Sequence, residues 1–326
     1  MFSSKAPNDN LKPKKFLILR FSSIGDIVLT SSVIRCLKKK FPTAEIHFAT
    51  KSSYFSILEA NPYLSKIHLL DNQGILNLLA RLRKENFDEV IDLHNNLRTK
   101  VIKVVLGKKS ASFNKENLKK LMLVRFKINY MPKVHIVDRY MATVAHLGVE
   151  NDNLGLDYFY DKKNNISKDF LPITHKNEFC VIAIGGQHFT KKLPLHKLIA
   201  LCRSVELPIV LVGGKEDTQI SIQIANEIGS KVFDTCGQLT INQSASLIKS
   251  SLKVYTHDTG MMHIAAAYKK EIEVYWGNTM SDFGMYPYKT QHINHEVAGL
   301  ECRPCSKIGF DKCPKGHFKC MEQHQV

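Results

Sequence analysis

The stretch KFLILRFSSIGDIVLTSSVIRCLKKKF, residues 15–41, decides the fold of this chain. A short apolar run over 15–21 leads into a turn and then into residues with helical spacing that end in a basic turn. This order predicts a buried strand followed by a helix. The turn carries an acid, Asp26, where nucleotide-binding folds usually place glycines. Asp26 is therefore a candidate functional residue, and an ordinary helix cap is the simpler interpretation.

Strand-like and helix-like segments continue to alternate through the first half of the chain. Apolar runs typical of strands and amphipathic segments typical of helices follow one another at residues 44–50, 54–62, 65–71, 75–87 and 88–94. Such alternation predicts a parallel sheet covered by helices on both faces. Residues 107–135 are basic and show no clear period, whereas residues 135–149 predict a helix closed by Gly148.

A second alternating set begins at residue 178, after a polar and turn-rich segment that predicts a linker. Strand-like and helix-like segments lie at residues 178–186, 193–205, 208–214, 216–229, 241–252, 253–258, 260–270 and 272–278. A chain of 326 residues also exceeds the usual size of one domain. We therefore predict an α/β protein with Rossmann-like domains over residues 1–160 and 177–298, a linker over 161–176 and a Cys-rich tail over 299–326.

The chain is basic, with 46 Lys and Arg against 30 Asp and Glu and a formal net charge of +16. This charge favours an anionic partner such as nucleic acid, a phosphorylated sugar or an acidic membrane face, although a merely soluble basic surface is the simpler interpretation. The basic residues are scattered and accompany no known nucleic-acid module, so no nucleic-acid partner is expected. Residues 1–14 lack the pattern of a signal peptide, and no apolar run approaches the roughly 18 residues of a membrane span, so we expect a cytoplasmic protein.

In the second half, predicted strands end in turns that carry polar groups. In AIGGQHFTKKLP, residues 183–194, a glycine pair lets the backbone approach a ligand, and Lys191 or Lys192 offers charge for a phosphate. In VLVGGKED, residues 210–217, a second glycine pair precedes Glu216. Because the carboxyl ends of parallel strands share one edge of a sheet, ligands of open α/β sheets bind there.

A third turn, in VYTHDTGMMHIAAA, residues 254–267, joins a strand to a helix. Asp258, Thr259 and Gly260 form the junction, and His263 lies in the first helical turn. The free N–H groups and the positive dipole end of a helix favour an anion here, so the junction is a candidate diphosphate cradle. Each of the three turns also has a structural interpretation, since glycine pairs routinely end strands and aspartate often caps helices.

Common nucleotide-binding fingerprints are absent from this sequence, which contains neither G-x-G-x-x-G nor G-x-x-x-x-G-K-[ST]. No Asp-x-Asp pair occurs either, so the simplest sequence signal for a metal that bridges a nucleotide diphosphate is missing. Lysine and backbone amides would then neutralise the phosphate charge.

Together these motifs resemble glycosyltransferase family 9, the lipopolysaccharide heptosyltransferases. The resemblance runs from about residue 15 to 290 and rests on SSIGDIVLTSSVIRCLKKKFPTAEI, TKKLP, LVGGKED, CGQLTINQSASLIKSSLKVYTHDTGMMHIAAA and YWGNT. It implies a GT-B fold, in which two Rossmann-like α/β/α domains face one another across a cleft. The N-terminal domain would lie on the acceptor side, and the C-terminal domain would bind the nucleotide sugar. The resemblance also implies an inverting, metal-independent transfer from an ADP-heptose-type donor, with no cofactor required.

The resemblance also implies roles for individual residues. Asp26 matches the catalytic base, Lys191 the phosphate-binding lysine and Glu216 the acid that holds the donor ribose. The residues that match the segment in contact with the diphosphate and the sugar are Asp258, Thr259, Gly260 and His263.

Several positions depart from the family pattern. Leu193 replaces the usual tryptophan of a K-x-W-P turn, Met261 replaces a frequent proline, and WGNT stands for the common F-G-P-T. Gly186 and Gln187 occupy positions that often carry hydroxyl groups, and Gln187 is included in the predicted donor-binding set.

The C-terminal segment CRPCSKIGFDKCPKGHFKC has the spacing C-x2-C-x7-C-x6-C. Four thiolates, Cys302, Cys305, Cys313 and Cys320, or three of them with His317, would close a tetrahedral zinc site. Disulfides are disfavoured in the cytoplasm. Similar tails occur in the family outside the catalytic machinery, so redox-active or simply free thiols remain alternatives to structural zinc.

The implied function is the transfer of a sugar, in the first instance heptose, onto a lipopolysaccharide core or a related surface glycan. The partners would be the nucleotide-sugar donor and a lipid-linked acceptor at the inner face of the cytoplasmic membrane. Two alternatives stay open, another two-domain nucleotide-sugar enzyme with a different donor, and a non-catalytic carbohydrate or nucleic-acid binder on the same fold. Asp26, Lys191 and Glu216 together favour an enzyme, because a binder does not need a carboxylate that faces the cleft.

Overall fold

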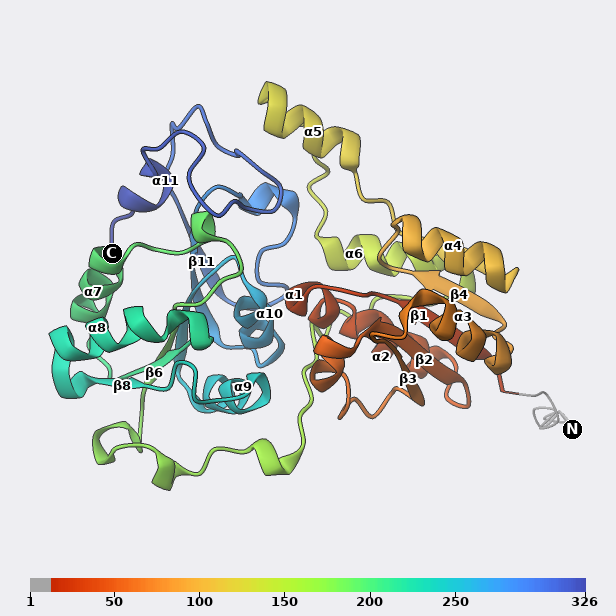
Figure 1. Ribbon diagram of the computed structural model, residues 1–326, viewed down its shortest axis with the longest axis horizontal. Helices are drawn as coiled ribbons and strands as arrows, with labels where there is room; N and C mark the ends of the chain where they lie inside the picture. Colours follow the sequence, from red (N-terminus) through yellow and green to blue (C-terminus); the bar gives the residue numbers. More distant parts are fainter. Residues whose placement is uncertain (1–12) are drawn as a thin grey trace, which may run out of the picture.

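A computed structural model describes residues 13–326, so the first twelve residues of the predicted N-terminal domain and most of the segment judged for a signal peptide lie outside the described residues. Two parallel sheets, each flanked by helices, lie side by side (Figure 1). The predicted α/β class with two Rossmann-like units is confirmed. No helix in residues 13–326 has the length and apolar character needed to cross a membrane.

The first sheet has five parallel strands in the order β3-β2-β1-β4-β5. Its strands are β1 (Lys15–Leu19), β2 (Glu45–Lys51), β3 (Lys66–Leu70), β4 (Glu89–Asp92) and β5 (Lys109–Ser112). The helices of this half are α1 (Ile24–Val28), α2 (Ser31–Lys40), α3 (Gly74–Glu85), α4 (Leu97–Leu106), α5 (Asn117–Phe126) and α6 (Ile136–Met141). The unpatterned stretch 107–135 thus holds an edge strand and α5.

The helix predicted after the first strand is broken in two at Leu29 and Thr30. The Thr30 hydroxyl donates to the Ile27 carbonyl at 2.7 Å, and such a bond back to the preceding turn bends a helix. The short helix α1 is thereby separated from α2 and lies between the two sheets (Figure 1).

The second sheet has six parallel strands in the order β11-β10-β9-β6-β7-β8. Its strands are β6 (Cys180–Ala183), β7 (Ile209–Val212), β8 (Val232–Asp234), β9 (Lys253–His257), β10 (Glu271–Trp276) and β11 (His292–Glu296). Its helices are α7 (Leu195–Ser204), α8 (Thr218–Ile228), α9 (Ile241–Ser250), α10 (Gly260–Ala267) and α11 (Lys319–Glu322). The edge strands β8 and β11 were not predicted, because one is very short and the other is polar.

Between the sheets, the proposed linker 161–176 contains three single 3₁₀ turns, Lys162–Asn164, Lys168–Phe170 and Ile173–His175. The tail 299–326 packs on the second domain, where Phe318, Cys320 and Met321 enter the apolar cluster beneath α7 and α8. The boundaries 1–160, 161–176, 177–298 and 299–326 remain predictions.

Candidate active site

Asp26 lies in the first turn of α1, just beyond the carboxyl end of β1. The N-cap residue of this helix is Ser23, so Asp26 does not itself cap α1. The carboxylate reaches back from the third helical position and accepts hydrogen bonds from the Ser23 amide at 3.1 Å and the Ser23 hydroxyl at 2.9 Å. Asp26 therefore closes the turn between β1 and α1.

The second oxygen of Asp26 forms an ion pair with Arg20, a residue that the sequence analysis did not single out. Arg20 Nη2 lies 2.5 Å from Asp26 Oδ1, while the guanidinium also donates to the Leu93 and Ser22 carbonyls. Arg20 follows the last residue of β1 and is buried. The sequence signal for it was a basic residue within a buried apolar strand run, which implies a partner of opposite charge.

The ion pair determines the protonation of Asp26. Burial by itself would raise the pKa of this carboxyl, but Arg20 and the Ser23 hydrogen bonds outweigh burial and lower the pKa to about 2. The carboxylate is therefore ionised at neutral pH and can accept a proton.

The two domains meet where α1 contacts α10, and two glycines allow this contact. A Cβ atom on Gly25 would lie 2.5 Å from His263 Cδ2, and one on Gly260 would lie 2.5 Å from Ile24 Cγ2. The helix of Asp26 is thereby brought against the helix that begins with the predicted diphosphate cradle.

Gly25→Ala is expected to push α1 away from α10. The added methyl group has no room beside the buried His263 ring, and overpacking of this kind costs about 1–3 kcal/mol. We expect a lower unfolding midpoint, measured by thermal unfolding, and lower initial rates of the sugar transfer that the family resemblance implies. Gly74→Ala is the control for stability alone, because its Cβ would meet open space although its φ of +80° adds backbone strain. Parental rates in Gly25→Ala would show that this contact does not position Asp26.

His263 is the residue on which both sides of the site converge. Burial lowers its pKa to about 4, while the Asp258 and Asp26 carboxylates oppose this shift and Lys191 adds to it. Its ring is neutral at pH 7, and Nδ1 has no hydrogen-bond partner within residues 13–326. His263 therefore offers a buried, unpaired nitrogen between the Asp26 turn and the turn after β9.

On the second sheet, Lys191 and Asp258 are paired. Lys191 Nζ lies 2.6 Å from Asp258 Oδ2 and 3.3 Å from the Asp258 carbonyl oxygen. The Thr279 hydroxyl donates to the same Oδ2 atom at 2.9 Å. Thr279 was quoted within YWGNT but not predicted as a site residue, and the structure shows that it fixes Asp258.

Lys192 points to a different carboxylate. Its Nζ lies 3.2 Å from Asp217 Oδ1, and the other Asp217 oxygen accepts the Gly214 amide at 2.9 Å. Asp217 is almost fully buried. The two adjacent lysines of one turn therefore separate, Lys191 toward the β9–α10 turn and Lys192 toward the turn after β7.

The amino terminus of α10 has no side-chain cap. Its N-cap residue, Thr259, makes no side-chain capping hydrogen bond, so the first amides, beginning with Gly260, have no such partner. Gly186 lies against Thr259, with its Cβ position 3.4 Å from Thr259 Cγ2. Gln187 and Glu216 are exposed in the turns after β6 and β7.

The C-terminal tail is hydrogen-bonded to the turns that follow β6 and β10. The Phe310 amide donates to the Thr190 hydroxyl at 2.9 Å. In return, the Thr190 amide donates to the Phe310 carbonyl at 3.1 Å. Arg303 donates to the Thr279 carbonyl at 2.9 Å and to the Gly277 carbonyl at 2.7 Å. The tail thus supports the residues that hold Lys191 and Asp258.

The thiols of the tail are not arranged as a closed metal site. Cys302 Sγ lies 3.8 Å from His317 Nε2, and the Cys305 thiol donates to the Cys302 carbonyl at 2.9 Å. Within residues 13–326, no three ligand atoms of the tail lie within 4.8 Å of one another. All four tail cysteines are free thiols, so zinc remains a prediction that requires them to approach one another.

A cavity of about 430 Å³ lies at a different place, between the segment before α6 and residues 281–294. Neither Asp26 nor Lys191 lines it. The candidate active site is therefore assigned by the convergence of charged groups at the carboxyl ends of the strands and not by the volume of a cavity.

Comparisons with known proteins identify the family and the fold of this chain. Residues 75–313 match the family model of glycosyltransferase family 9 (heptosyltransferase). The chain is 29% identical over 312 residues to lipooligosaccharide heptosyltransferase 2 of Campylobacter jejuni, covering 92% of this chain and 91% of the relative. It is 22% identical over 293 residues to lipopolysaccharide heptosyltransferase 1 of Campylobacter coli, covering 82% and 85% of the two chains.

Solved structures share the fold. Escherichia coli ADP-heptose lipopolysaccharide heptosyltransferase II superposes with a TM-score of 0.69 at 18% identity, covering 95% of this chain and 98% of the other. Escherichia coli heptosyltransferase WaaC, solved with ADP, gives a TM-score of 0.66 at 17% identity, with coverage of 86% and 93%. These similarities confirm the predicted GT-B fold.

Proposed function

This chain belongs to glycosyltransferase family 9, the heptosyltransferase family, and from that membership we propose that it transfers heptose from ADP-heptose to a lipopolysaccharide core or a related surface glycan. Its curated relatives carry the names of lipopolysaccharide and lipooligosaccharide heptosyltransferases. The observation that carries the proposal is the set of groups around the buried His263. The ionised carboxylate of Asp26 lies on one side of it, and Lys191, beside the uncapped amino terminus of α10, lies on the other.

The proposed reaction is a single inverting displacement. An acceptor hydroxyl forms the new C–O bond at the anomeric carbon, the bond to the diphosphate breaks, and ADP leaves with the electron pair. Asp26 takes the hydroxyl proton, and Arg20 holds the carboxylate in place. Lys191 and the amides of Thr259 and Gly260 stabilise the charge that develops on the diphosphate.

The proposed transfer requires no divalent metal. The sequence has no Asp-x-Asp pair, and Lys191 with the amino terminus of α10 supplies positive charge where a diphosphate would lie. Glu216 is proposed to hold the donor ribose, and Gln187 and His263 to contact the donor. Lys191 would keep one of its three donors on Asp258 and turn the others to phosphate.

A thermal-shift screen of ADP, GDP, UDP and their sugars tests the proposal. A ligand at about 100 times its dissociation constant stabilises the folded protein by roughly 2.7 kcal/mol. We expect ADP and ADP-heptose to raise the unfolding midpoint most. A clear preference for UDP or GDP would favour another nucleotide-sugar enzyme, and salt-dependent binding of nucleic acid without any nucleotide response would favour the binder.

The location of the acceptor is proposed from the surface of the N-terminal domain. Helices α4 and α5 both lie toward one end of this domain, and α5 stands away from its body (Figure 1). Exposed apolar side chains on these helices are Leu97, Val101, Val104, Leu118, Leu121 and Phe126. They alternate with basic residues such as Lys100, Lys119 and Arg125. Apolar and basic residues interleaved in this way suit an anionic lipid surface, so we propose that the protein works as a peripheral protein on the membrane that carries its lipid-linked acceptor.

Replacing Leu118 and Leu121 with aspartate is expected to release the protein from vesicles of phosphatidylglycerol and phosphatidylcholine. Both side chains are exposed, so the fold should tolerate the change, while the contact with the lipid loses apolar area and gains repulsion. Vesicle co-sedimentation at low and high salt measures the effect. Ile173→Asp, at an exposed apolar position in the proposed linker, is the matched control. Unchanged sedimentation of the double variant would show that α5 does not contact the membrane.

For the tail we propose structural zinc, held by Cys302, Cys305, Cys313 and Cys320. Protein purified under reducing conditions would then carry about one equivalent of metal more than a variant with serine at these four positions. Because the tail holds Thr190 and Thr279, a chelator is expected to loosen the donor side without removing any catalytic group. Elemental analysis that finds equal metal content in the two proteins would show that the cysteines are free thiols.

A further inference from the structure

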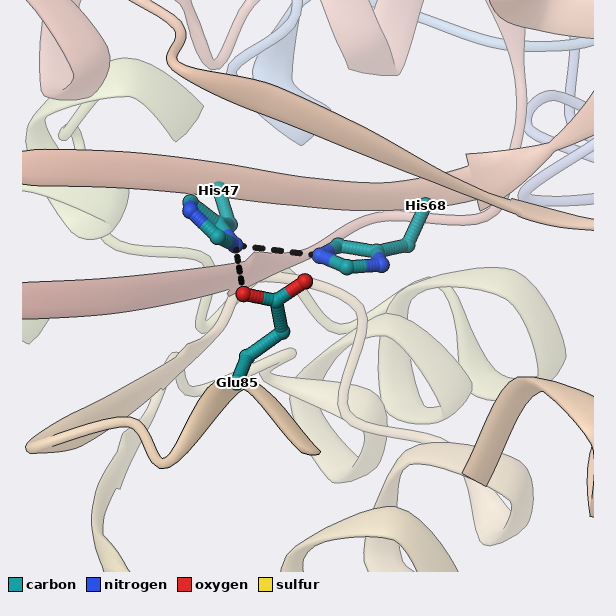
Figure 2. A group of neighbouring side chains, drawn as sticks. All are labelled: His47, His68 and Glu85. Atoms are coloured by element: carbon teal, nitrogen blue, oxygen red, sulfur yellow. Dashed lines mark hydrogen bonds and ion pairs between the residues drawn. The ribbon is translucent and has the colours of Figure 1, made fainter. Parts of the chain in front are cut away.

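A group of titratable side chains lies in the first sheet, away from the candidate active site. His47 on β2 and His68 on β3 are neighbours across the two strands, and Glu85 at the end of α3 points to them (Figure 2). His47 Nδ1 lies 3.0 Å from His68 Nε2 and 3.9 Å from Glu85 Oε2. Both histidines are buried. The proposed sugar transfer uses none of these residues.

The two facing nitrogens cannot both carry a proton at this distance, so at least one presents a lone pair to the other. His47 Nε2 lies 3.4 Å from Glu45 Oε2, and a proton on Nε2 would leave Nδ1 free as an acceptor. Burial also lowers the pKa of both rings, which agrees with neutral imidazoles at pH 7.

We propose that His47 Nδ1, His68 Nε2 and Glu85 Oε2 bind one borderline-soft divalent cation of the zinc type. Zinc bonds of about 2.0–2.2 Å in a tetrahedron place ligand atoms roughly 3.3 Å apart. The observed separations of 3.0 and 3.9 Å lie on either side of that value, and all three ligand atoms fall within 4.8 Å of one another. Within residues 13–326 this is the one group of three such ligands so arranged.

The neighbours of the three ligands resemble the outer shell of a metal site. Glu45 Oε2 lies 3.4 Å from Nε2 of His47, the ring nitrogen that would not face the ion, and a carboxylate in that place favours the tautomer that a metal ligand needs. Lys66 holds the other oxygen of Glu85 at 2.5 Å and leaves Oε2 toward His47. Lys15 Nζ lies 2.9 Å from Glu45 Oε2 and 3.6 Å from Glu85 Oε2, so the proposed ligand oxygen also faces this ammonium group.

The ligand set selects the class of ion. Two imidazole nitrogens and one carboxylate suit zinc or a similar transition metal, whereas magnesium and calcium require mostly oxygen ligands. Lys15 and Lys66 already balance the negative charge of Glu45 and Glu85. Binding of the metal ion would therefore depend mainly on the imidazole lone pairs. The ion would join β2, β3 and the end of α3, and it would stabilise the folded domain without a part in the chemistry at Asp26.

The site is tested by metal binding to the full-length chain in which serine replaces Cys302, Cys305, Cys313 and Cys320. These replacements prevent the tail from binding the added metal. Equilibrium dialysis against zinc is expected to give one equivalent and a higher unfolding midpoint, and magnesium is expected to give neither. His68→Asn should abolish binding, and Glu45→Gln should weaken it by about 10–100-fold. His146→Asn is the control, because His146 pairs with Glu89 in the same domain and lies outside the group.

Glu85→Gln provides a second route if His68→Asn does not fold, because it removes a ligand at the end of a helix and not within the sheet. Cobalt gives an independent readout in the same four-serine chain, because any cobalt spectrum without thiolate charge-transfer bands must then come from nitrogen and oxygen ligands. The proposal is overturned if the folded four-serine chain takes up no zinc. It is also overturned if Glu85→Gln and His68→Asn, made in that chain, bind zinc with unchanged affinity. Sugar transfer is expected to be unchanged in Glu85→Gln, so this result is independent of the proposed function.

Discussion

Asp26→Asn is expected to lower the rate of sugar transfer by a factor of roughly 10²–10⁴, the loss typical of a removed general base. Asparagine can still accept the hydrogen bonds from Ser23 that close the turn, but it cannot take a proton from the acceptor hydroxyl. Donor binding should stay close to that of the parent, because the residues proposed to bind the donor belong to the domain of the second sheet. Initial rates and a nucleotide thermal shift measure the two effects separately.

The structure adds a stability cost to this substitution. Asp26 has a pKa of about 2 against an ordinary 3.8, a difference that corresponds to about 2 kcal/mol in favour of the folded state. Because the pKa is lowered in the folded protein, the carboxylate stabilises the fold at pH values above its ordinary pKa of 3.8. This contribution is lost as the pH falls through about 2. The substitution also leaves the buried Arg20 without its carboxylate. Rates must therefore be compared at equal folded fraction.

Ser23→Ala is the matched control for the turn, since it removes one hydrogen bond to Asp26 and leaves the proton acceptor in place. Its rate should remain near that of the parent. Because Asp26 is ionised throughout, we also expect no fall in rate between pH 8 and 5 through this group. If Asp26→Asn transfers sugar at the parental rate, Asp26 only closes the turn. The alternative bases are His263 and His94, which follows β4 and accepts from the Phe21 amide at 3.4 Å. Their pKa values of about 4 leave both rings neutral.

Lys191→Ala is expected to weaken ADP and ADP-heptose binding and to slow transfer by about 10²–10³-fold, the usual cost of one missing donor at a developing anion. The lysine reaches the turn that leads into α10, where the diphosphate is proposed to lie. Without it, the charge of the leaving group is met only by the amides of Thr259 and Gly260. Steady-state kinetics and nucleotide affinity measure the loss.

Lys192→Ala should behave differently, because Lys192 is paired with the buried Asp217. Its removal leaves a buried carboxylate with fewer partners, so the effect should fall on the unfolding midpoint more than on the kinetics. Lys215→Ala, at an exposed lysine after β7, controls for a general loss of positive charge. A kinetic loss at Lys192 equal to or larger than that at Lys191 would show that the phosphate-binding lysine has been assigned to the wrong position.

The sequence alone determined the two Rossmann-like units and the turns in which the candidate residues lie. Apolar periodicity is local, so a buried run such as 15–21 and the amphipathic segment after it can be identified without knowledge of their neighbours. Glycine pairs at strand ends are equally local signals. Since parallel strands place their carboxyl ends together, even the shared edge of the site in the second domain follows from the strand order.

The tertiary structure decided which charges meet. Lys191 and Lys192 are indistinguishable in sequence, yet they pair with carboxylates 67 and 25 residues away, and only the packing of three turns separates them. The ion pair of Arg20 with Asp26, the support of Thr279 by the tail and the pairing of His47 with His68 likewise depend on how strands and turns pack. Such contacts leave no periodic trace in a sequence, because the distance between two side chains in space is set by the fold and not by their separation along the chain.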